Sequence, residues 1–190
     1  MGKKIVIILM AMTILMIVSF YYDAQIVKAV YSMQDYYLTQ FFLGIAFISS
    51  EIIIFFLLTS LFLWQERKRK WIIPLWITLG VSAGANYILK NSIQRLRPFE
   101  QGIVPLALNL HDSLSQFSFP SFHAVITFCA LPILSREFPK LKYWWIAFAV
   151  IVAFSRVYLG VHFMSDVLAG AILGYCIGEL IVAVKTRKIF

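Results

Sequence analysis

The chain has 190 residues, of which 61% are hydrophobic and 14% charged, and its mean hydropathy is +0.83. This composition excludes an ordinary water-soluble domain and indicates that most of the chain lies in a lipid bilayer. The formal net charge is +8, but the basic residues form short runs between apolar stretches, which argues against a nucleic-acid-binding face. At this length we expect a single domain over residues 1–190.

Six apolar stretches approach the roughly 20 residues that a membrane-spanning helix requires. In chain order they cover 5–22, about 41–64 with Glu51 near the middle, 70–90, 121–135, about 143 to beyond 156, and about 162–184. No small-residue cleavage site follows the first stretch before Asp23, so we expect it to be retained as a span. The sequence therefore predicts an all-α, polytopic membrane protein with six transmembrane helices in a bundle.

The segment between the first two stretches is amphipathic. Over 24–40, Ile26, Val30, Met33 and Tyr37 recur at helical intervals among polar residues. This pattern is compatible with an interfacial helix on the outer leaflet and equally with an ordinary loop.

Glycines recur at four-residue steps in two of the predicted spans. They are Gly80 and Gly84 in the third stretch, and Gly170, Gly174 and Gly178 in the sixth. Small residues at this spacing let helix backbones approach closely within a membrane, so we expect both sets to lie at helix–helix contacts.

The distribution of basic residues predicts the orientation. Twelve of the 17 lie at the amino terminus, in the 65–71 and 136–142 loops, and at the carboxyl terminus, and five lie on the other side. Basic loops stay preferentially in the cytoplasm. We therefore expect a multi-pass protein of the cell membrane with both termini cytoplasmic.

Three polar clusters interrupt the apolar stretches on the side with few basic residues. The first contains Lys90, Arg95 and Arg97. If the third helix continues through them, Lys90 and Arg97 lie two turns apart on one face and can bind the same anion. Alternatively, they are interfacial anchors for lipid headgroups.

The second cluster, Pro120-Ser121-Phe122-His123, stands at the start of the fourth stretch. Ser121 is in the position of a helix N-cap, and the free backbone N–H groups of a helix N-terminus attract anions. Taken alone, His123 is equally compatible with a hydrogen-bonded structural histidine.

The third cluster contains Ser155, Arg156, His162 and Asp166. Arg156 lies about 20 Å of helix beyond Lys142, near the outer membrane boundary, where it requires an anionic partner. His162 and Asp166 are one helical turn apart, so the carboxylate can bind one ring nitrogen and leave the other free to attack.

Together the three clusters resemble the signature of the type 2 phosphatidic-acid phosphatase (PAP2) superfamily, whose helical core is shared with vanadium haloperoxidases. The matching motifs are Lys90-x6-Arg97-Pro98, Pro120-Ser121-x-His123 and Ser155-Arg156-x5-His162-x3-Asp166. The resemblance implies hydrolysis of a lipid phosphate or pyrophosphate on the extracytoplasmic side, with no metal and no cofactor. Phosphatidylglycerol phosphate, phosphatidic acid and undecaprenyl pyrophosphate are the substrates that it suggests.

The resemblance also implies a role for each residue. His162 would attack phosphorus and form a phosphohistidine, Asp166 would fix the His162 tautomer, and His123 would act as acid and then base. The phosphate oxygens would be bound by the three cations and the serine, namely Lys90, Arg97, Arg156 and Ser121. Arg95, Ser155 and Phe122 are expected to have supporting roles, and for Arg95 we expect a contact to a headgroup or loop.

Phe122 departs from the family pattern, which has glycine at this position. Phenylalanine excludes a positive φ, so activity persists only if the position does not require the backbone freedom of glycine. In that case we expect the ring to point at lipid or at the substrate's chain. Two alternatives stay open: a lipid phosphotransferase that uses the same site, and a catalytically weak protein that binds or transports lipid phosphates.

Overall fold

The computed structural model describes residues 3–105 and 117–187, and these residues form helices and no strands. The elements are α1 (Lys3–Tyr31), α2 (Tyr36–Ile48), α3 (Glu51–Trp64), the 3-10 helix η1 (Glu66–Trp71), α4 (Ile72–Ile93), α5 (Phe122–Glu137), the 3-10 helix η3 (Pro139–Leu141), α6 (Lys142–Tyr158) and α7 (Met164–Arg187). Residues 106–116, between α4 and α5, lie outside the described residues. The all-α prediction is confirmed.

Four described segments are long and apolar enough to cross a membrane: Ile5–Tyr31, Glu66–Ile93, Pro139–Tyr158 and Met164–Arg187. A fifth is reached if α2 and α3, which are bent by 62° at the break between them, count as one span. The fourth predicted stretch corresponds to α5, which has 16 residues, fewer than a full span requires. The polytopic membrane architecture is thus confirmed, while the count of six stays a prediction.

The second apolar stretch is broken at Ser49 and Ser50, so a continuous helix over 41–64 was a wrong expectation. The Ser49 hydroxyl donates a hydrogen bond to the Ala46 carbonyl oxygen at 3.2 Å, and such local serine bonds compete with the helical ladder. Glu51 therefore lies in the first turn of α3, where a carboxylate is favoured by the helix dipole.

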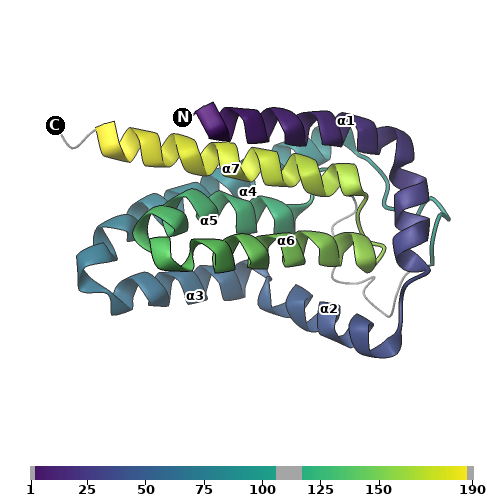
Figure 1. Ribbon diagram of the computed structural model, residues 1–190, viewed down its shortest axis with the longest axis horizontal. Coiled ribbons are helices and arrows are strands. Elements are labelled where there is room, and N and C mark those ends of the chain that lie inside the picture. Colours follow the sequence, from purple (N-terminus) through teal and green to yellow (C-terminus); the bar gives the residue numbers. More distant parts are fainter. Residues whose placement is uncertain (1–2, 106–116, 188–190) are drawn as a thin grey trace.

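The amphipathic segment over 24–40 does not form a separate helix. Its first part continues α1 as far as Tyr31, and α2 begins only at Tyr36. The side chain of Asp35 caps α2 by accepting hydrogen bonds from the backbone N–H groups of Tyr37 and Leu38. Figure 1 shows that the last part of α1 turns away from the first part, toward α2.

Helices α5 and α7 pack against each other with their backbones close together. A Cβ atom added at Gly170, Gly174 or Gly178 would lie 2.6, 2.3 or 2.3 Å from a backbone oxygen of α5 or its N-cap. The prediction of close packing is therefore confirmed for this set. It is wrong for Gly80 and Gly84, where an added Cβ meets nothing within 4 Å among the described residues.

Apart from the last part of α1, the helices run roughly along the long axis of the molecule (Figure 1). The start of α1 and the end of α7 lie at one end of the bundle, together with the α3–α4 connection. The start of α5, the end of α6 and the start of α7 lie at the opposite end, which we call the site end. Five of the residues singled out above, Arg97, Ser121, Arg156, His162 and Asp166, are at most 4% exposed there.

Candidate active site

Lys90 and Arg97 reach the site end from α4 and from the loop that follows it. Helix α4 ends at Ile93, and Gln94 adopts a left-handed conformation with a φ of 52°. The condition that the helix continues through Arg97 is therefore not met. The loop nevertheless returns Arg97 to the bundle, where its Nη1 donates a hydrogen bond to the Val161 carbonyl oxygen at 2.7 Å. Lys90 Nζ donates to the Phe117 carbonyl oxygen at 2.6 Å.

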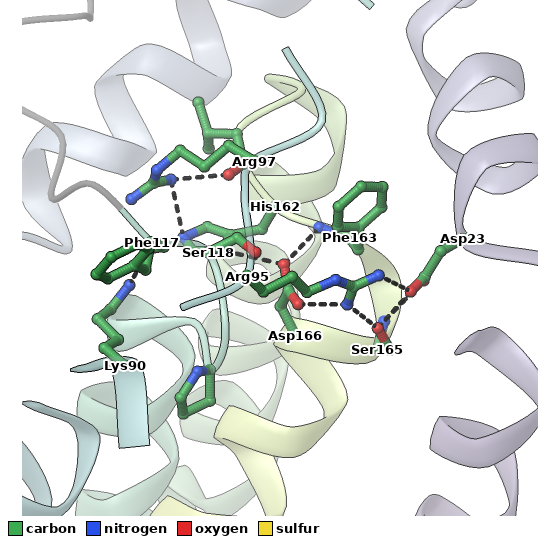
Figure 2. Close-up of polar contacts among 12 residues, drawn as sticks. Asp23, Lys90, Arg95, Arg97, Phe117, Ser118, His162, Phe163, Ser165 and Asp166 are labelled. Atoms are coloured by element: carbon green, nitrogen blue, oxygen red, sulfur yellow. Dashed lines mark hydrogen bonds and ion pairs between the residues drawn. The ribbon is translucent and has the colours of Figure 1, made fainter. Parts of the chain in front are cut away.

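His162 lies between Arg97 and Asp166 (Figure 2). It precedes α7 by two residues. The prediction that His162 and Asp166 share one helical turn was therefore wrong. Even so, its Nδ1 is 3.5 Å from Asp166 Oδ2, and its Nε2 is 3.4 Å from Arg97 Nη1. The pairing of the histidine with the carboxylate thus arises from the turn that leads into α7.

The electrostatic surroundings keep His162 neutral. Burial lowers the pKa of His162 well below 6.5, and the charges of Arg97, Lys90 and Arg156 lower this pKa further. Burial also lowers the pKa of Arg97 to about 10, while Glu100 and Asp166 oppose this shift, so the guanidinium stays charged at neutral pH. A neutral imidazole therefore faces the fixed positive charge of Arg97 on its Nε2 side.

Asp166 is fully buried in the first turn of α7. Its Oδ2 accepts a hydrogen bond from the Phe163 backbone N–H at 2.9 Å, and its Oδ1 forms a 2.7 Å ion pair with Arg95 Nη1. Arg95 also forms a 2.7 Å ion pair with Asp23 and donates to Ser165 Oγ at 2.6 Å. Arg95 therefore contacts the predicted catalytic carboxylate, Asp166, and not a headgroup or loop as expected (Figure 2).

His123 and Arg156 form the second histidine–arginine pair of the site. Arg156 Nη1, in the last turn of α6, is 3.3 Å from His123 Nε2, in the first turn of α5. Arg156 Nε donates to Ser155 Oγ at 3.3 Å, so Ser155 orients the guanidinium. The backbone N–H of Ser121, two residues before His123, donates to the Asp166 carbonyl oxygen at 3.0 Å, which joins the two pairs into one site.

Three buried polar atoms at this site have no hydrogen-bond partner among the residues that the structure describes: Ser121 Oγ, Arg156 Nη2 and His162 Nδ1. Ser121 is the N-cap residue of α5, as predicted, but its hydroxyl does not bond to the helix. Buried polar groups are normally paired. A tetrahedral oxyanion would offer oxygen acceptors to the serine and the guanidinium, and it would also match the surrounding cations.

Phe122 is the first residue of α5 and has an ordinary negative φ. The fold therefore does not use the backbone freedom of glycine at this position. The ring is half-buried and packs against the hydrophobic core that includes Leu79 and Ile126. Whether the exposed part of the ring faces lipid or a substrate's chain stays a prediction.

Sequence reasoning missed Asp23 and Ser165. Ser165 donates to both oxygens of the Asp23 carboxylate, through its backbone N–H to Oδ1 and through its hydroxyl to Oδ2. The two residues are 142 positions apart, and no motif links them. The available signal was a carboxylate within the first apolar helix, because such a group requires a partner.

The fold and the site define a class of protein: an all-α membrane protein with two histidines, three cations and a buried carboxylate gathered at one end of its helix bundle. Residues 71–190 match the model of the PAP2 superfamily. The chain belongs to this superfamily.

Curated relatives agree with this assignment. The chain is 38% identical over 109 residues to phosphatidylglycerophosphatase B of Bacillus subtilis, covering 52% of this chain and 50% of the relative. It is 35% identical over 131 residues to the undecaprenyl-diphosphatase of Sulfolobus acidocaldarius, covering 67% of this chain and 62% of the relative. The chain thus spans about half to three fifths of the length of these two relatives.

Two solved structures have the same fold. One is the crystal structure of a transmembrane PAP2-type phosphatidylglycerolphosphate phosphatase from Bacillus subtilis, with a TM-score of 0.75 and 25% identity, covering 96% of this chain and 97% of that one. The other is Aquifex aeolicus LpxE, with a TM-score of 0.70 and 26% identity, covering 85% and 94%. The first likeness, which covers 96% of this chain, extends to helices that precede the family-matched segment.

Proposed function

We propose that this protein is a membrane phosphatase that hydrolyses a lipid phosphate or pyrophosphate through a phosphohistidine intermediate. The observation that carries the proposal is the convergence of two histidine–arginine pairs, with Arg97 3.4 Å from His162 and Arg156 3.3 Å from His123. A nucleophile and an acid–base group beside fixed cations are what phosphoryl transfer through a covalent intermediate requires.

In the first step, His162 Nε2 attacks phosphorus. The nitrogen–phosphorus bond forms, and the bond from phosphorus to the alcohol or phosphate leaving oxygen breaks. His123, which is protonated once the anionic phosphate group lies beside it, donates its proton to that oxygen. In the second step, His123 takes a proton from water, the water oxygen bonds to phosphorus, and the nitrogen–phosphorus bond breaks. Asp166 holds the Nδ1–H tautomer and stabilises the positive charge on the ring.

Lys90, Arg97 and Arg156 would bind the non-bridging oxygens, together with Ser121. These cations are held by the protein itself, through the Phe117 and Val161 carbonyl oxygens and through Ser155. Preorganised charge of this kind stabilises the transition state without reorganisation during the reaction. The proposed chemistry therefore needs no metal ion or cofactor.

The substrate class follows from the chemistry of the site and from the names of the relatives. Phosphatidylglycerol phosphate, phosphatidic acid and undecaprenyl pyrophosphate each combine a phosphate group with an apolar tail that can stay in the bilayer. We place the protein in the cell membrane, with both termini cytoplasmic and the site facing outside. The basic connection at Glu66–Trp71, at the opposite end of the bundle from the site, supports this orientation.

Detergent-solubilised protein should be assayed for phosphate release from these three lipids, with and without an acceptor lipid. We expect release without acceptor, and none from the His162→Ala variant. Phosphate transfer that requires an acceptor would indicate a phosphotransferase. Binding without turnover in the parent, or equal activity in the His162 variant, would refute the proposed mechanism.

A further inference from the structure

We propose that Asp23, on α1, is a positioning residue for the reaction: through Arg95 and Ser165 it holds Asp166 in place to support His162. This inference rests on the proposed function and adds a residue outside the 71–190 segment that matches the family model. It assigns to the first helix a part in the chemistry.

The contacts form a continuous chain that is buried except at Arg95, whose side chain is 20% exposed. Asp23 is 3% exposed, and both of its oxygens accept hydrogen bonds from Ser165. Arg95 Nη2 contacts Asp23 Oδ2 at 2.7 Å, and Arg95 Nη1 contacts Asp166 Oδ1 at 2.7 Å. The other Asp166 oxygen lies 3.5 Å from His162 Nδ1. The path from α1 to the nucleophile thus runs through the side chains of four residues in order: Asp23, Arg95, Asp166 and His162.

Aromatic rings fix the guanidinium of Arg95 in this arrangement. Its Cζ is 4.0 Å from the centroid of the Phe163 ring and 5.1 Å from that of Phe20. Arginine binds two carboxylates with defined geometry because its donors form a rigid planar fork. Asp23 and Phe20 both come from α1, so this helix supplies the carboxylate and one of the rings.

The charge balance explains why a second carboxylate is needed. Arg95 alone would neutralise Asp166 and weaken its interaction with His162. With Asp23 present, two carboxylates share one guanidinium, so this group keeps a negative formal charge on the Nδ1 side of the imidazole, while Arg97 faces Nε2. That charge stabilises the positive charge that the His162 ring acquires when it bonds to phosphorus.

The test compares Asp23→Asn with Asp35→Asn, a matched change at the exposed N-cap of α2, where asparagine caps as well as aspartate. Activity is expressed per folded molecule, from the monodisperse chromatographic peak. We expect Asp23→Asn to lower kcat by about 10- to 100-fold with KM little changed, and Asp35→Asn to match the parent.

A double-mutant cycle separates positioning from a general structural role. Because Asp23 acts through Asp166, adding Asp23→Asn to Asp166→Asn should cause little further loss of kcat, whereas independent effects would multiply. Multiplying losses would overturn the inference. If Asp23→Asn does not fold, Asp23→Glu keeps the charge, displaces the carboxylate by one methylene, and enters the same cycle.

The controls also distinguish this inference from the proposed function. If the parent releases phosphate, the His162→Ala variant does not, and Asp23→Asn equals Asp35→Asn, then only the role of Asp23 is refuted. If the parent releases no phosphate, the affinity for orthovanadate, which mimics the transferred phosphoryl group, is measured by calorimetry instead. This affinity depends on the same network of side chains. We expect weaker binding in Asp23→Asn than in Asp35→Asn, and equal affinities would refute the inference.

Discussion

Replacing Gly174 by alanine tests whether close packing of α5 and α7 sets the distance between the two histidines. The added Cβ would lie 2.3 Å from the Val125 carbonyl oxygen, against 3.4 Å for ordinary van der Waals contact, a shortfall of about 1 Å. Because the obstacle is backbone, the two helices must separate. His123 lies on α5, and His162 lies two residues before the start of α7. A displacement of about 1 Å between catalytic groups can lower kcat by about 100-fold.

The matched control is Gly84→Ala, where an added Cβ meets nothing within 4 Å of the described residues. Phosphate release and Tm should be measured for both variants. We expect Gly174→Ala to lose about 1–3 kcal/mol of stability from overpacking, together with the loss of kcat. Gly84→Ala should match the parent or be slightly more stable, because alanine favours a helix. Equal kcat values for the two variants would refute the idea that α5–α7 packing sets the site geometry.

Four further predictions concern the site itself. The pKa of His162 lies below 6.5 in the folded state, so as pH falls through about 6.5 the unfolded chain binds the proton first. Between about pH 7 and 5, the Tm of the parent should therefore fall more than the Tm of His162→Gln. An equal fall in Tm for the two proteins would contradict this prediction. Phe122→Gly should lower the free energy of unfolding by about 1–3 kcal/mol in denaturation experiments, because ring burial and helix propensity are lost. We expect little change in kcat, and a large gain in kcat would show that phenylalanine impairs the site. Arg156→Lys should lower kcat by about 100-fold, as expected when one preorganised donor is lost; unchanged kinetics would exclude Arg156 from phosphate binding. Chelators should leave phosphate release intact, and a loss reversed by Mg²⁺ would refute the metal-independent mechanism.

The sequence predicted which site residues lie near one another more accurately than it predicted the helices and loops that bring them together. Motif spacing assigned Lys90 and Arg97 to one site, and both reach the site end of the bundle, although α4 ends at Ile93 and does not continue through Arg97. Similarly, the pairing of His162 with Asp166 was expected from one helical turn but arises from a loop. The motifs specify which groups meet, and the backbone route depends on tertiary packing that residue spacing does not encode.

Other features depend on contacts between segments far apart in the chain. The network of Asp23, Arg95 and Ser165 joins three segments, and no periodicity relates them. The glycines at Gly80 and Gly84 have the same spacing as those on α7, yet only the α7 set faces another backbone. Hydropathy identified the apolar helices because their composition is local. It did not identify their contacts or the break at Ser49, which depends on local hydrogen bonding.

The central claim is that His162 carries the phosphoryl group during turnover. It can be tested most directly by mixing the protein with a lipid phosphate labelled in its phosphoryl group, quenching under alkaline conditions that preserve phosphohistidine, and mapping the modified residue by mass spectrometry. We predict transient labelling of His162, greater accumulation of the label when His123 is replaced by alanine, and no label in His162→Ala. Phosphate release that proceeds with no labelled intermediate, or with the label on another residue, would contradict the account.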